Sequence, residues 1–109
     1  MLVVNKNSGF LKIDEVISLK FTSGEEVIGK IVEVDDAEIK LYRPCSIGAN
    51  PQTGQMDMLK WMILADKDKP VSVIKTSIMA YGSPDSNIAE LYESKTSNIV
   101  KASAGIIAT

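Results

Sequence analysis

The chain has 109 residues, of which 45% are hydrophobic and 24% are charged, a composition typical of one globular domain with a single core. Its 12 basic and 14 acidic residues give a net charge of -2, which argues against a broad basic surface for duplex DNA or an anionic membrane. Histidine is absent, which excludes Ser-His-Asp triads, Cys-His nucleophiles and His-containing zinc sites. We therefore expect a protein that is not an enzyme, with no catalytic residues, no metal and no cofactor.

Cysteine usage and the first residues indicate the compartment. The single Cys45 cannot form an internal disulfide, and a lone thiol suits a reducing cytosol. The sequence MLVVNK lacks the basic region of a signal peptide, and no apolar run approaches the ~18–20 residues that span a bilayer. We therefore expect a cytoplasmic protein that does not enter a membrane.

The first half of the chain reads as strands after an expected N-terminal arm over residues 1–11. Apolar residues at every second position predict a half-buried first strand: Ile17, Leu19 and Phe21. A second strand is predicted over residues 26–34, with apolar residues on both faces. Gly29 inside this strand indicates a sharp bend or a close approach of a neighbouring backbone.

Three further strands are predicted. The third alternates over residues 39–47, and Pro44 within it must lie at an edge or a bulge because proline cannot donate a ladder hydrogen bond. A polar hairpin tip over residues 48–55 leads to a fourth strand over residues 56–65, which is apolar on both faces. A short fifth strand follows over residues 71–74.

From Ser83 onward the pattern becomes helical. Ser83 suits an N-cap, and Pro84 suits the first helical position. Apolar residues then follow at helical spacing: Ile88, Leu91 and Tyr92, with Ile99 further along the stripe. We expect a helix over residues 84–95, and the pattern assigns no structure to the tail over residues 96–109.

Together these elements predict a mostly β fold with a C-terminal helix. Five short antiparallel strands linked by turns indicate a small, strongly bent barrel of the SH3-like, Sm-like or OB-like kind. The barrel is expected over residues 12–82, and the helix and tail over residues 83–109.

Two sequence motifs narrow this choice. Residues 21–29 read Phe-Thr-Ser-Gly-Glu-Glu-Val-Ile-Gly, and residues 36–41 read Asp-Ala-Glu-Ile-Lys-Leu after an apolar strand. This arrangement resembles the first motif of the Sm-like family of Sm, LSm and Hfq proteins, with a spacing one residue longer than usual unless Asp35 takes the place of Asp36. Residues 74–78, Ile-Lys-Thr-Ser-Ile, resemble the second motif but lack its Gly or His.

The resemblance covers about residues 12–81 and implies a strongly bent, five-stranded open barrel. Family members assemble into rings because the fourth strand of one subunit pairs with the fifth strand of the next. We therefore expect a homo-oligomeric ring of five to seven subunits. A compact polar hairpin tip and a helix after the barrel are similar to features of phage-encoded relatives, so a bacterial cytoplasm is the expected location.

The fourth strand favours such a ring independently of the resemblance. A strand that is apolar on both faces needs cover on both, and an exposed apolar edge invites aggregation unless it is paired. The expected interface residues are Met58, Trp61, Met62, Leu64, Val71 and Val73. In the alternative reading, the C-terminal helix covers the second face within a monomer.

The resemblance also implies an RNA site, because in RNA-binding relatives the turn between strands two and three meets the turn after strand five near the pore. The candidate RNA-binding residues carried over are Asp36, Ile39, Lys40, Lys75, Thr76 and Ser77. Ile39 takes the base-stacking position and Lys40 the Asn position, while Lys75 supplies the basic residue. In a ring, the two lysines of every subunit would converge and attract a polyanion.

Two functions follow from these observations. The first is a ring that binds short single-stranded RNA and acts in RNA metabolism or regulation. The second is a structural or adaptor ring that binds no RNA and holds a protein partner through residues 50–55 or the helix. The lysines favour the first function, whereas the absent Asn, the absent stacking aromatic and the acidic balance favour the second.

Overall fold

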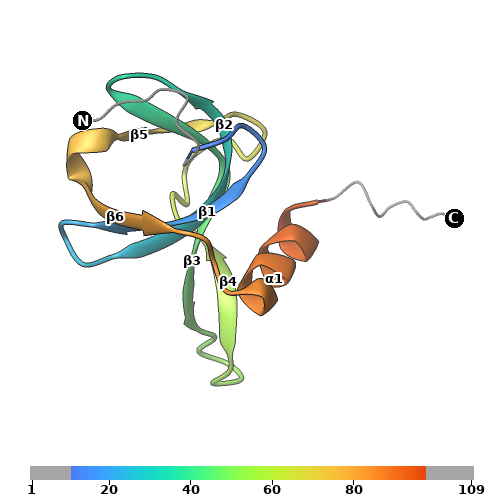
Figure 1. The fold of residues 1–109 in the computed structure, drawn as a ribbon. Helices are drawn as coiled ribbons and strands as arrows, with labels where there is room; N and C mark the ends of the chain where they lie inside the picture. The colour runs from blue at the N-terminus through green and yellow to red at the C-terminus, as the bar shows by residue number, and fades with distance from the viewer. Residues whose placement is uncertain (1–10, 98–109) are drawn as a thin grey trace, which may run out of the picture.

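The computed structural model describes residues 11–97, which form a mostly β structure with one C-terminal helix (Figure 1). The strands are β1 (Val16–Phe21), β2 (Glu26–Val34), β3 (Glu38–Ala49), β4 (Met56–Lys60), β5 (Val71–Ile74) and β6 (Ile78–Gly82). A single-turn 3₁₀ helix, η1 (Lys75–Ser77), joins β5 to β6, and the helix α1 spans Ser86–Thr96. Most of the predicted arm, and the tail from residue 98 with Ile99, lie outside the described residues.

The strand β3 organises the sheet. It pairs along one edge with β2, and along the other edge with both β4 and β5. The order β4-β3-β2-β1-β6 leaves β4 and β6 at the two ends of the antiparallel sheet. The sheet curves strongly but is not closed into a barrel (Figure 1). The predicted mostly β class with a C-terminal helix is confirmed, and the sheet has a sixth strand, β6, that the pattern did not predict.

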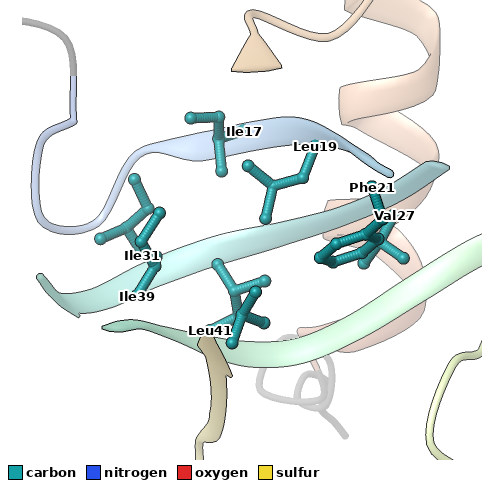
Figure 2. Packing of buried hydrophobic residues seen from close by; sticks show 8 residues of the cluster. Ile17, Leu19, Phe21, Val27, Ile31, Ile39 and Leu41 are labelled. Atoms are coloured by element: carbon teal, nitrogen blue, oxygen red, sulfur yellow. The ribbon is translucent and has the colours of Figure 1, made fainter. Parts of the chain in front are cut away.

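The inner face of the curved sheet carries the main core (Figure 2). Its buried members alternate along the strands, as the period of two in the sequence predicts: Ile17, Leu19, Phe21, Val27, Ile31, Ile39, Leu41 and Val73. Trp61 stacks on Phe21 with ring centroids 5.2 Å apart and covers one end of this cluster.

α1 covers part of the outer face of the sheet. A second buried cluster forms there: Ile28, Cys45, Met58 and Tyr92, with Val16, Ile88 and Leu91 packed against it. This arrangement explains why β2 is apolar on both faces, since Val27 and Ile31 face the main core while Ile28 faces the helix. Because Met58 of β4 lies in this cluster, the arrangement also favours the alternative in which the C-terminal helix covers the second face of the fourth strand within one subunit.

A bulge interrupts the pairing of β2 with β3. Ile28 pairs with Cys45 but Lys30 pairs with Tyr42, so β3 contains an extra residue at this point. Arg43 adopts a positive φ of 44° there, directly before Pro44. The prediction that Pro44 lies at an edge or a bulge is therefore confirmed, because the residue without an N–H falls where the ladder is broken.

The hydroxyl of Tyr92 fills this interruption. It accepts a hydrogen bond from the Lys30 N–H at 3.0 Å and donates one to the carbonyl of Tyr42. The ring of Tyr92 is fully buried, and desolvation raises the pKa of its phenol. One helical side chain thus satisfies two backbone groups of the sheet and fixes α1 against the bulge.

The start of α1 differs from the sequence prediction. The N-cap is Asp85, whose carboxylate accepts from the Asn87 N–H at 2.8 Å, so the helix begins at Ser86 and not at Pro84. Asp85 is a better N-cap than Ser83 because its carboxylate combines a cap hydrogen bond with a favourable charge at the helix N-terminus.

The predicted fourth strand over residues 56–65 is too long, because β4 ends at Lys60. The chain turns at Trp61, whose N–H donates to the Pro44 carbonyl at 3.0 Å. The Lys60 ammonium then donates to the carbonyls of Ile63 and Ala65 and holds the loop beyond the strand. The apolar run that resembled a two-faced strand is therefore partly an exposed loop.

We expect Gly29→Ala to destabilise the protein. A Cβ at Gly29 would lie 3.1 Å from the Cβ of Leu41 in the core, which is tighter than ordinary contact. Overpacking of this kind costs about 1–3 kcal/mol of unfolding free energy, measurable by urea denaturation. Gly82→Ala is the matched control, because a Cβ there meets no atom within 4 Å. Equal stability of the two variants would contradict the predicted close approach at Gly29.

We expect Tyr92→Phe to destabilise the protein by about 2–4 kcal/mol, because the Lys30 N–H and the Tyr42 carbonyl would both lose their partner. Urea unfolding followed by circular dichroism measures the effect. Tyr42→Phe is the control, since the Tyr42 hydroxyl makes no hydrogen bond within residues 11–97. A loss below about 0.5 kcal/mol for Tyr92→Phe would show that the bulge does not need the hydroxyl.

Candidate functional site

The two segments that carry the predicted RNA site lie side by side. The turn between β2 and β3 meets η1, because the Lys75 N–H donates to the Ala37 carbonyl at 2.8 Å. The ladder then continues from this point, with Glu38 opposite Ile74. The backbone thus brings Lys40 and Lys75 to one end of the sheet, although 35 positions separate them in the sequence.

Asp35, and not Asp36, makes the side-chain hydrogen bonds that orient this turn. The Asp35 carboxylate accepts from the N–H groups of Ala37 at 2.9 Å and Glu38 at 2.8 Å. These two hydrogen bonds lower the pKa of Asp35, and the nearby charges of Lys40 and Lys75 lower it further. Asp36 is exposed. The acidic residue that orients the turn between β2 and β3 is therefore Asp35.

Ile39 does not present its side chain to a ligand. It is 2% exposed, because the alternation of β3 directs it into the main core opposite Val73. The predicted packing of Ile39 against a base is therefore not available in the folded subunit. The alternation in the sequence puts Ile39 on the apolar face of its strand, and this face packs into the main core.

The remaining candidates differ in their availability. Lys40 is half-buried and forms an ion pair with Glu33 at 3.6 Å. The Ser77 hydroxyl donates to the Ile74 carbonyl at 2.7 Å and so stabilises the turn. Thr76 is exposed, and Lys75 is half-buried. Among the predicted RNA-binding residues, Thr76 and the ammonium groups of Lys40 and Lys75 are therefore the hydrogen-bond donors that this end of the subunit can offer to a partner.

Acidic side chains surround these lysines. Four carboxylates lie along the turn and its flanking strand residues: Glu33, Asp35, Asp36 and Glu38. Two ammonium groups cannot balance four carboxylates, so a single subunit does not present a phosphate-attracting surface here.

The predicted interface residues are mostly used inside the subunit. Met58 and Val73 are buried, and Trp61 and Val71 are half-buried. Only two members reach the surface to a large extent: Met62, 45% exposed, and Leu64, 99% exposed. Met58 is not available to another subunit because α1 covers it. Val73 is not available because it belongs to the main core.

The structure reveals an apolar surface that the sequence reading missed. β6 lies at one end of the sheet, contains no charged residue and exposes Met79 by 60%. Tyr81 on the same strand is also exposed. At the other end of the sheet, β4 exposes Met56 and Leu59. The uncharged run over residues 78–82 was the available signal, but its short length concealed it.

The described residues offer few other kinds of site. Within residues 11–97, no three His, Cys, Asp or Glu side chains are grouped so that they could hold a metal ion. No helix in the same range has the length and apolar character needed to cross a bilayer. No protein-family model matches the chain, and no curated protein matches its sequence. What the structure defines is a mostly β protein with a curved antiparallel sheet and a helix on its outer face.

Proposed function

We propose that this chain is a ring-forming structural protein of the Sm-like kind, whose subunits join when β6 of one copy pairs with β4 of the next. The observation that carries the proposal is the uncharged, apolar edge strand β6. Exposed strand edges are normally protected by charges, proline or bulges, since their free N–H and C=O groups pair readily with another chain. β6 has no charge and no proline along its length, and its one irregularity is a bulge at Met79 in the pairing with β1.

The two edges match each other. β4 and β6 are five residues long, and each exposes large apolar side chains. The charged groups of β4 are engaged within the subunit, because Asp57 pairs with Lys95 at 3.3 Å and Lys60 donates to loop carbonyls. Pairing of unlike edges is head-to-tail, and such contacts form a ring when the rotation between copies closes.

The resemblance to Sm-like proteins supports the same assembly. The curved sheet ends in two strands, β4 and β6, that are each paired along one edge only, and the two motif segments meet at one end of the subunit. In the adaptor alternative, a ring would hold a protein partner at the hairpin tip over residues 50–55, of which residues 51–55 are exposed.

We expect Met79→Lys to break the assembly, because a charge on the β6 edge opposes its burial against another strand. Native mass spectrometry should give multiples of the 11.8 kDa subunit for the wild type and a shift toward monomers for Met79→Lys. Ile13→Lys is the matched control, since Ile13 is similarly exposed at 54% and lies outside the strands. Wild-type monomers at micromolar concentration would contradict the proposal.

Single-stranded RNA is the second candidate, as a ligand of such a ring. The observation that favours it is the convergence of Lys40 and Lys75 on one end of the subunit, beside Asp35. Repetition of this end around a ring axis would place many ammonium groups close together. The carboxylates at the same end oppose phosphate binding.

We expect an Lys40→Ala/Lys75→Ala variant to lose RNA binding if RNA binds this end. Fluorescence anisotropy with U-rich and A-rich oligonucleotides, at about 50 and about 200 mM salt, should show weaker binding at the higher salt. Lys12→Ala is the control for a general loss of positive charge. Equal RNA affinity of the double variant and Lys12→Ala would place the RNA elsewhere, and no binding by an intact ring would favour the adaptor function.

A further inference from the structure

A cavity of about 190 Å³ lies where the β3 bulge, β4, the loop after β4 and the end of α1 meet. Five of the twelve basic residues of the chain line it: Arg43, Lys60, Lys67, Lys69 and Lys95. Asp66 is the acidic residue in its wall. The cavity therefore gathers positive charge in a protein whose net charge is -2.

The remainder of the wall is largely apolar. Its members come from the bulge, from β4 and β5, and from the loop between those strands: Pro44, Cys45, Met58, Met62, Ala65 and Val71. Cys45 and Met58 are buried and belong to the cluster under α1. An apolar floor beneath a basic rim favours a ligand with one apolar part and one anionic part.

Arg43 holds the frame of the cavity. Its guanidinium donates to the Lys67 carbonyl at 3.0 Å, to the Thr96 carbonyl at 2.8 Å and to the Asp68 carboxylate at 3.1 Å. The side chain is 12% exposed, and it joins the bulge to the loop and to the last turn of α1. These contacts reach two separate segments, the loop after β4 and the last turn of α1, so the cavity is formed before any ligand arrives.

The lysines of the wall are unequally neutralised. Lys67 pairs with Asp68, and Lys95 pairs with Asp57, each at 3.3 Å. Lys60 donates only to loop carbonyls, which carry no net charge. The Lys69 backbone N–H donates to the Asp66 carbonyl at 3.2 Å, but its side-chain ammonium has no hydrogen-bond or ion-pair partner within residues 11–97. Two ammonium groups at the cavity thus lack a carboxylate partner in the part of the chain that the structure describes.

We propose that this cavity binds a small anion with an apolar body, an aromatic carboxylate being the chemical class that fits best. A cavity of about 150 Å³ accommodates benzene, so this volume holds a body of one or two aromatic rings. The apolar body lies on Met58 and Val71, and the carboxylate reaches Lys69. This site is separate from the lysines at the β2–β3 turn, and one subunit builds it entirely.

Isothermal titration calorimetry with 2-naphthoate tests the proposal. We expect a Kd of about 1 mM or tighter for the wild type. Lys69→Ala should weaken binding about fivefold, because it removes one partly solvated ion pair. Lys12→Ala is the matched control, since Lys12 is exposed and does not line the cavity. The neutral 2-naphthamide and inorganic phosphate should both bind more weakly than 2-naphthoate.

A second measurement locates the ligand. Cys45 is the single cysteine of the chain and lies in the cavity wall, so saturating 2-naphthoate should slow its alkylation by iodoacetamide. Four results would each overturn the proposal: no binding at millimolar concentration, 2-naphthamide or phosphate binding as tightly as 2-naphthoate, equal affinities of Lys69→Ala and the wild type, or an unchanged rate of alkylation.

Discussion

The hydroxyl of Tyr92 is the contact on which the arrangement of this subunit depends. It occupies the gap that the β3 bulge opens in the ladder with β2, and it serves the Lys30 N–H and the Tyr42 carbonyl together. A buried backbone group without a partner is costly, so the bulge and the helix stabilise each other. Because α1 is fixed there, the part of the outer face around Ile28, Cys45 and Met58 is covered within one subunit.

The covered outer face determines which surfaces remain for partners. Met58 lies under α1, and Ile39 lies in the main core, so neither can serve the role that the family resemblance implied. The large apolar side chains that stay exposed lie instead on the edge strand β6 and on the loop that carries Leu64. The same bulge directs Arg43 toward the loop and the end of α1, and so frames the cationic cavity.

Local rules predicted much of the sheet. The alternation in β1 and β3, the interruption at Pro44 and the close approach at Gly29 all follow from side-chain period and backbone chemistry. The length of β4 could not be predicted in this way, because an apolar loop and a strand buried on both faces give the same pattern. For the candidate site, the sequence predicted that its two turns meet. It did not predict that Ile39 is buried in the main core.

The sequence by itself determined the class of the protein, because strand periodicity, turn residues and a capped helix are local properties. It also excluded histidine chemistry, since composition alone decides that question. Only the tertiary structure decided which apolar side chains remain exposed and which lysines lack a carboxylate partner. Both depend on contacts between distant segments, such as Arg43 with Thr96 and Lys30 with Tyr92, and no local pattern records such contacts.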